Sequence, residues 1–400
     1  MLVQEKGKAQ LRLLATSHGL NHVYQLLTPV IIPEITSDYA LSDTTAGLLL
    51  ACFAVSYALL PVLAGYLSTI LGRRRILTLG FVTSSLAFAA MAVTDNIAVL
   101  ALLFFMAGVG GATYHPNGVP ILAEIYPTSR GRTLGLHQTG GALGSVIGPL
   151  ATGALVLGFT WRPALVVLAV PGLVLAATLW FKIPSEHTPK KTESDPVRNS
   201  ARAKVDWKTY APIAVFFAAA YLYVLGLRGT DAFAAQYFVY GRGMEFITAS
   251  ILFSTLKVAG LFSAPLCGWL SDRYNRKKVL AALVIVESAS LYAITITPTM
   301  LLAIPCIIFG FAAFGLLGVG EALLADITPP DQLSKVFGWN FTLSFSSSII
   351  LAPALGFISD NYTFNLGFLL LSAIMPLSIL LILKIKTKPT QQKQCPRLVK

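Results

Sequence analysis

Residues 65–77 read GYLSTILGRRRIL, and residues 268–280, which begin 203 positions later, read GWLSDRYNRKKVL. Each copy closes a long apolar segment, passes through a basic cluster and opens the next apolar segment. A repeat at half the length of a 400-residue chain indicates two homologous halves. Because the flanking segments are long and apolar, each half is predicted to consist of membrane-spanning helices.

The composition is that of a membrane protein. Hydrophobic residues make up 55% of the chain and charged residues only 12%, against roughly 25% charged residues in a soluble domain. The net charge of +12 does not indicate nucleic-acid binding, because the cations stand in short clusters between apolar runs. The four cysteines form no CxxC pair, so neither a disulfide framework nor a zinc site is expected. We expect a lipid bilayer around the chain, no metal and no cofactor.

Twelve segments are long and apolar enough, at about 20 residues each, to cross a bilayer as helices. The predicted fold is an all-α membrane protein with twelve transmembrane helices in two homologous six-helix bundles. The predicted parts are an N-terminal bundle (1–182), a cytoplasmic linker (183–209), a C-terminal bundle (210–386) and a basic tail (387–400). The predicted helices cover 12–33, 45–71, 76–94, 97–126, 132–158, 161–182, 210–240, 246–271, 278–297, 299–326, 335–358 and 363–385.

The positions of Lys and Arg predict the orientation in the membrane. Twelve spans place both termini on one side, and all but four of the 30 Lys and Arg residues fall on that side. The exceptions are Arg228 and Lys257 inside predicted helices, and Arg162 and Arg242 in loops on the other side. We therefore expect a multi-pass protein of the cell membrane with both termini in the cytoplasm. We also expect it to be a monomer. The opposite loops carry the acidic residues Glu34, Asp38, Asp43, Asp95 and Asp360.

The repeat continues beyond the first stretch and resembles the major facilitator superfamily over essentially the whole chain. Residues 123–135, AEIYPTSRGRTLG, align with 325–338, ADITPPDQLSKVFG, so Glu124 corresponds to Asp326. The family's loop between its second and third helices is approximately G-x-L-x-D-R-x-G-R-[RK]-x. Residues 268–278 match this motif except at Asn275, whereas residues 65–75 have Thr69 and Ile70 in place of its Asp and Arg.

Two further motifs carry the resemblance. GALGSVIGPLATG at 141–153 resembles the antiporter-associated motif of the fifth helix, and its matching residues are Gly144, Gly148, Pro149 and Gly153. The step Tyr114–His115–Pro116 resembles the fosmidomycin-resistance branch of drug exporters. The Arg that many members carry in the fourth helix is absent, and Phe104 stands about there. Glycines at a spacing of four allow tight helix packing, so a purely structural role for the fifth-helix motif stays open.

The resemblance implies a secondary active transporter in which two bundles rock around a central site, and no enzymatic activity. The fifth-helix motif favours proton-coupled efflux of a small amphiphilic compound or drug. The alternative is symport or uniport of an anionic organic metabolite, drawn by Arg228 and Lys257. A receptor would need a signalling domain, and the short linker cannot supply one.

The two signature loops are expected to act as gates. Gly65 and Gly268 should let neighbouring backbones approach closely, and the cations should meet the negative carboxyl ends of helices. Glu124 and Asp326 are candidate partners for these cations, in pairs that form when the cytoplasmic side is closed. Simple positive-inside anchoring is the alternative for the cations. The candidate gating residues are Gly65, Gly72, Arg73, Arg74, Glu124, Gly268, Asp272, Arg273, Arg276 and Asp326.

A polar stripe with positions i, i+3, i+4 and i+7 runs along the first predicted helix. It must face protein or a watery cavity, because polar groups facing lipid are costly. The interrupted stretch 108–118, GVGGATYHPNG, marks a candidate substrate site on the fourth helix. Histidine titrates near neutral pH, which suits coupling to protons; the alternative is that each histidine bonds a carbonyl and only shapes the cavity. The candidates are His18, His22, Gln25, Tyr114, His115, Asn117 and His137.

The second half carries charges inside its predicted helices, which are functional candidates by default. Arg228 and Asp231 are three residues apart and can pair on one helix face. Lys257 and Glu287 lie near the middle of consecutive helices, where either a structural ion pair or a transport role is expected. Arg228 is placed to meet an anionic substrate, and Glu321 is a candidate proton acceptor or gate partner.

Overall fold

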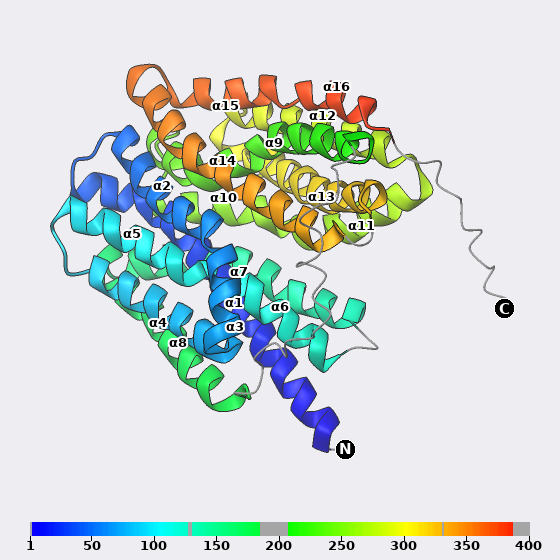
Figure 1. Cartoon of the computed structure of the whole chain (residues 1–400). Helices are drawn as coiled ribbons and strands as arrows, with labels where there is room; N and C mark the ends of the chain where they lie inside the picture. The colour runs from blue at the N-terminus through cyan, green and yellow to red at the C-terminus, as the bar shows by residue number, and fades with distance from the viewer. Residues whose placement is uncertain (1, 127–129, 185–206, 330–331, 387–400) are drawn as a thin grey trace.

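The computed structural model describes residues 2–126, 130–184, 207–329 and 332–386, which form helices joined by short turns (Figure 1). Most of the predicted linker, 185–206, and the predicted tail lie outside the described residues. Helices satisfy their own backbone hydrogen bonds, which lipid cannot do for them. The predicted all-α fold is confirmed.

The helices of the first half correspond to the six predicted spans, with the second and fourth spans each broken in two. They are α1 (Leu2–Asp38), α2 (Asp43–Leu59), α3 (Pro61–Leu71), α4 (Arg73–Met91), α5 (Ile97–Ala112), α6 (Tyr114–Ile125), α7 (Arg130–Gly158) and α8 (Trp161–Lys182).

The helices of the second half likewise correspond to six predicted spans, with the eighth and twelfth broken. They are α9 (Trp207–Gln236) with the π-helical turn η3 (Tyr237–Gly241), α10 (Phe246–Val258), α11 (Gly260–Arg273), α12 (Arg276–Ile296), the 3₁₀ turn η4 (Thr299–Leu301), α13 (Ala303–Ile327), α14 (Leu333–Asn361), α15 (Phe364–Ile374) and α16 (Leu377–Lys384).

Three of the four breaks lie at a proline. Pro61 begins α3, Pro116 lies in the first turn of α6, and Pro376 precedes α16. Proline donates no backbone hydrogen bond and its ring clashes with the preceding turn, so the helix restarts there. The first break bends the span by 49°.

By length and apolarity, nine helices of the described residues could cross a membrane, or ten if α2 and α3 count as one bent span. The two remaining spans, α1 and α4, are more polar. The first carries the polar stripe, and the second begins with three arginines. Both still pack within the first half, α1 against α7 and α4 against α5 and α8.

Two groups of helices, α1–α8 and α9–α16, lie side by side (Figure 1). The contacts between the groups run along α2 with α14, α7 with α10, and α1 with α9. Small residues permit the closest of these approaches. A Cβ atom added to Gly47 of α2 would overlap the backbone of α14 at Ala352. The interface between the halves therefore depends on glycine at this point.

The repeated basic clusters occupy equivalent places in the two halves. Arg74 donates to the carbonyl of Ile183, 3.5 Å away, just beyond the end of α8. Lys277, which is 203 positions further along, donates to the carbonyl of Ile385, 3.0 Å away, just beyond α16. Cations at the carboxyl end of a helix are stabilised by unpaired carbonyls and the helix dipole. We call the end of the molecule that carries 73–75 and 273–278 the basic end.

The two copies of the repeat make their turn differently. Gly72 has a backbone φ of +87°, a conformation that side chains rarely adopt. Its counterpart Asn275 has a φ of −64°, and its side-chain oxygen accepts hydrogen bonds from the amides of Lys277 and Lys278 at the start of α12. This is why the second copy can lack the glycine that the family motif has there.

At the opposite end, side chains tie the halves together. The carboxylate of Asp360, at the end of α14, accepts from the backbone amides of Asp43 and Thr44, at 2.8 and 2.9 Å. Asp43 in turn accepts from Gln236 at 2.7 Å and from Ser359 at 2.6 Å. A carboxylate at the amino end of α2 also meets the positive end of the helix dipole. We call this set of contacts the Asp360 tie.

Candidate functional site

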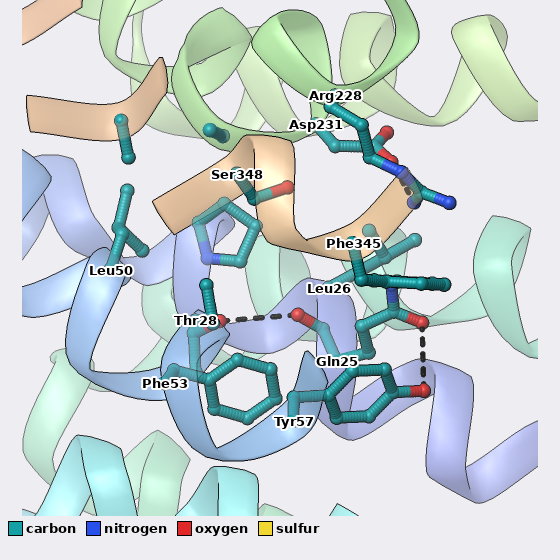
Figure 2. A pocket seen from close by; sticks show the side chains of 14 residues that line it. Gln25, Leu26, Thr28, Leu50, Phe53, Tyr57, Arg228, Asp231, Phe345 and Ser348 are labelled. Carbon is teal, nitrogen blue, oxygen red and sulfur yellow. Dashed lines mark hydrogen bonds and ion pairs between the residues drawn. The ribbon is translucent and has the colours of Figure 1, made fainter. Parts of the chain in front are cut away.

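A cavity of about 60 Å³ lies between the halves, lined by α1 and α2 on one side and by α9 and α14 on the other (Figure 2). Most of the lining is apolar, with leucine, alanine, proline and phenylalanine side chains. The charged groups of Arg228 and Asp231 lie on one side of the cavity in Figure 2. The lining residues that carry the argument are Gln25, Phe53, Tyr57, Arg228, Asp231 and Phe345.

One carboxylate is shared by two cations beside this cavity. Asp231 contacts Arg228, with 3.3 Å between Oδ2 and Nη1, and its other oxygen contacts the ammonium of Lys257. Arg228 and Lys257 are only 7% and 3% exposed. The guanidinium of Arg228 also lies 3.7 Å above the ring of Phe345, which is a favourable cation–π arrangement. The three ionisable groups together have a formal charge of +1.

The expected ion pair between Lys257 and Glu287 is wrong. Lys257 pairs with Asp231 instead, because α13 packs between α10 and α12 and keeps the two helices apart. Glu287 is buried against α9, where a Cβ atom on Gly226 would lie 3.0 Å from its Oε1. Among the described residues, neither of its carboxyl oxygens has a hydrogen-bond partner. Glu321 is exposed on α13 and is not a lining residue of the cavity.

The predicted polar stripe meets the histidines of α6 and α7. His18 is buried and lies flat on His137, with ring centroids 4.3 Å apart. The Nε2 atoms of His18 and His22 are 3.1 Å apart. The ring of His115 stands edge-on to His18 at 5.2 Å. Four histidines from three helices therefore form one cluster.

The hydrogen bonds of the cluster determine its tautomers in the neutral state. Nδ1 of His18 lies 3.1 Å from the carbonyl oxygen of His137, which can only accept, so this nitrogen carries the hydrogen. Nε2 of His18 then has a free lone pair and accepts from Nε2–H of His22. The coupling role of these histidines stays a prediction.

Two predicted substrate contacts are buried away from the cavity. The hydroxyl of Tyr114 contacts the carbonyl of Leu14 and lies 2.8 Å from Nε2 of His137. The amide of Asn117 donates to the carbonyl of Thr113 on its own helix at 2.8 Å. Neither Tyr114 nor Asn117 lines the cavity, so the interrupted stretch of the fourth span supports the histidine cluster instead.

The predicted ion pairs of the signature loops are present, but each lies within one half. Arg73 contacts Glu124 at 2.6 Å. At the equivalent positions of the second half, Arg276 contacts Asp326 at 2.8 Å and also Asp272 at 2.8 Å. These pairs exist while the opposite end is tied, and they connect helices of the same bundle. Their role in gating stays a prediction.

The predicted close packing at the motif glycines is wrong for this structure. A Cβ atom on Gly268 would meet no atom within 4 Å among the described residues, and one on Gly65 would make an ordinary contact of 3.5 Å with Pro116. Arg273 lies over the ring of Trp269, at 4.5 Å, and Trp269 is half exposed. Gly268 therefore faces open space, and Gly65 has room for a side chain against Pro116.

The glycines of the fifth-helix motif do pack tightly. A Cβ atom on Gly144 of α7 would overlap the carbonyl oxygen of Gly19 on α1. One on Gly148 would lie 3.0 Å from Cα of Val23, and one on Gly153 would lie 2.6 Å from Cβ of Ser250 in the other half. Close packing explains these glycines, and a coupling role stays a prediction.

Sequence reasoning missed two aromatic residues of the site. The Tyr57 hydroxyl lies 3.2 Å from the amide nitrogen of Asn21 and 3.4 Å from the side-chain oxygen of Gln25. Phe345 lies 5.2 Å from the Tyr57 ring and supports Arg228 from below in Figure 2. The sequence does not distinguish an aromatic residue of a binding site from one that only packs in the core, because most aromatic residues in apolar helices have the second role.

Comparison with known proteins gives matches over nearly the whole chain. The family model for the Major Facilitator Superfamily matches residues 15–262 and 232–398. The chain is 25% identical over 391 residues to a hexuronate transporter of Bacillus subtilis (strain 168), which covers 91% of each protein. It is 21% identical over 374 residues to a fosmidomycin resistance protein of Escherichia coli (strain K12), covering 91% of this chain and 89% of that protein.

The fold also matches a solved structure. A bacterial homologue of the human lysosomal transporter Spinster, in an inward-facing and unoccupied conformation, superposes with a TM-score of 0.80 at 18% identity. The match covers 96% of this chain and 99% of the other. At this level of identity the likeness concerns the arrangement of helices.

Proposed function

Because the chain belongs to the Major Facilitator Superfamily, a family of membrane transporters and not of enzymes, we propose that it carries a small organic anion across the cell membrane by alternating access. The predicted family resemblance is confirmed, including the likeness to a fosmidomycin resistance protein. The positions of Lys and Arg support cytoplasmic termini and a cytoplasmic basic end.

The observation that carries this proposal is the uncompensated charge at Arg228, Asp231 and Lys257. Two cations share one carboxylate, and all three groups lie in the interior of the bundle. A net charge inside the membrane region is costly unless a counter-charge is supplied. The carboxylate of a substrate in the cavity would supply it, and the planar fork of Arg228 suits two carboxylate oxygens.

The rest of the lining supports a substrate with an apolar body. Leu50 and Phe53 lie on the side of the cavity away from Arg228 and Asp231, as Figure 2 shows, and Leu26 is a further apolar lining residue. Gln25 and Tyr57 add one amide and one hydroxyl that could bond a hydroxyl or carbonyl of the substrate. The similarity to a hexuronate transporter, whose name denotes an anionic substrate, agrees with this chemistry.

The geometry of the two ends supports access from the basic end. The Asp360 tie joins the halves at the opposite end, whereas the ion pairs of the signature loops join helices within one half. Substrate would thus exchange with the cytoplasm in this state and with the outside once the tie opens.

Efflux of a drug-like compound is the second candidate. The similarity to a fosmidomycin resistance protein and the glycines of α7 favour it. The two candidates agree on the charged site and differ in the direction of net transport. Vesicles with a pH gradient of either sign measure that direction and show whether protons are coupled.

The proposal is tested by counterflow in proteoliposomes with a panel of carboxylates and the matching amides. We expect exchange of at least one carboxylate and none of its amide, because only the carboxylate neutralises the site. Arg228→Ala should abolish this exchange, and Arg228→Lys should lower it about tenfold, since lysine keeps the charge but loses the fork. Arg162→Ala, a change at the opposite end, is the control. Equal exchange by Arg228→Ala and the unchanged protein would contradict the proposal.

A further inference from the structure

Three histidines of the first half bring their ring nitrogens together next to the cavity. Ligand nitrogens of His18, His22 and His115 all lie within 4.8 Å of one another. They come from two helices, α1 and α6, whose relative position is fixed by buried contacts such as Tyr114 with Leu14. The cluster is therefore held by the packing of the bundle rather than by one mobile segment.

The spacing of the first two nitrogens fits a tetrahedral metal ion. Zinc binds histidine nitrogen at about 2.0–2.1 Å, so two ligands of a tetrahedral site lie about 3.3 Å apart. Nε2 of His18 and Nε2 of His22 are 3.1 Å apart. The third nitrogen, from His115, needs an approach of the order of 1 Å, which a rotation of its half-buried ring can supply.

The first ligand is also oriented as metal-binding histidines usually are. Such histidines donate their second ring N–H to a carbonyl or carboxylate, which sets the tautomer and points the other lone pair at the metal. Nδ1 of His18 donates to the carbonyl of His137. Its ring is also held flat against the ring of His137, at 4.3 Å. In the neutral cluster the lone pair of His18 Nε2 accepts from Nε2–H of His22, so the metal ion takes the place of that hydrogen and His22 binds as its Nδ1–H tautomer.

We propose that His18, His22 and His115 bind one divalent transition-metal ion of the zinc or nickel type, with the fourth position open to water. Imidazole is a preferred ligand of these ions, and three neutral ligands leave the ion its full charge. The proposed site lies next to the cavity, because His22 is one helical turn from the lining residue Gln25.

The test uses the full-length protein in detergent and Co²⁺ as a spectroscopic substitute for zinc. Tetrahedral Co²⁺ absorbs visible light much more strongly than the free hydrated ion, so titration reports both stoichiometry and geometry. We expect one Co²⁺ per chain, displaced by Zn²⁺. Substitution of His18, His22 or His115 by alanine should each weaken binding by about tenfold or more.

Two further variants make the result decisive. His187→Ala removes the one histidine of the five that is neither a proposed ligand nor His137, and it should leave the titration unchanged. His115→Cys should keep the site and add a thiolate-to-cobalt absorption band, which also shows that the substituted protein folds. No Co²⁺ band, or a band that survives His115→Ala, would overturn the proposal. Because the binding is read without any substrate, its failure is distinct from a failure of the proposed transport function.

Discussion

At the scale of single residues, the central feature is one acid between two bases. Asp231 contacts both Arg228 and Lys257, and the basic residues are almost fully buried. Removing one member of a buried cluster of charges leaves the others without a counter-charge. The loss of stability is then larger than the stability that the ion pair itself contributes. The charge balance of this cluster should therefore determine both stability and anion binding.

Asp231→Asn should destabilise the protein strongly, by about 3–5 kcal/mol, because it leaves two buried cations unpaired. The double change Asp231→Asn/Lys257→Met restores the original net charge and should recover part of that loss. Thermal unfolding in detergent measures both. Additive losses in the double variant would contradict the shared-carboxylate interpretation.

At the scale of elements, the contact between α1 and α7 depends on the absence of side chains. Gly144 abuts the backbone of Gly19, so the two helices approach at backbone distance. The three glycines at 140, 144 and 148 continue this face along α7. Close approach is how helices associate inside a membrane, where the hydrophobic effect does not drive them together.

Gly144→Ala should destabilise the protein by about 1–3 kcal/mol, since the added methyl group overlaps the carbonyl of Gly19. The matched control lies on the same helix. Gly135→Ala meets no atom within 4 Å among the described residues and should be neutral or slightly stabilising. Equal unfolding temperatures for the two variants would contradict the prediction, because they would mean that α1 and α7 can move apart to admit the methyl group without loss of stability.

The sequence predicts the helices well, but it does not predict which helices are neighbours. The repeat correctly relates Arg73 with Glu124 to Arg276 with Asp326, because pairs at one end of a span have few alternatives. The pairing of Lys257 could not be predicted, because it depends on α13 lying between α10 and α12. The position of a residue along a predicted helix indicates its depth in the membrane. Which neighbouring helix its side chain faces is known only from the packed structure.

At the scale of the whole molecule, two bundles meet along α2 and α14 and are tied at one end (Figure 1). Alternating access requires this tie to break while the basic end closes. In the proposed alternating-access cycle, the state described here is one of the two that the protein visits.

Asp360→Asn should weaken the tie and raise the population that is open at the opposite end. A cysteine placed at Ala232, which lines the cavity, should then react faster with a membrane-impermeant maleimide added from outside whole cells. Asp95→Asn is the control, because Asp95 lies at the same end but pairs with Arg162 within one half. Unchanged labelling rates in Asp360→Asn would show that this carboxylate does not hold the halves together.

The Asp360 tie has a consequence for turnover. Both Asp43 and Asp360 lie partly in water, so bonds lost on opening are replaced by bonds to solvent. The Asp360 tie therefore adds little to the free-energy difference between the two states. Buried ion pairs at the same place would stabilise the tied state strongly and slow its opening. A transporter that returns to its first state after every cycle needs contacts that break at small cost in free energy. The exposed position of Asp360 makes the Asp360 tie a contact of this kind.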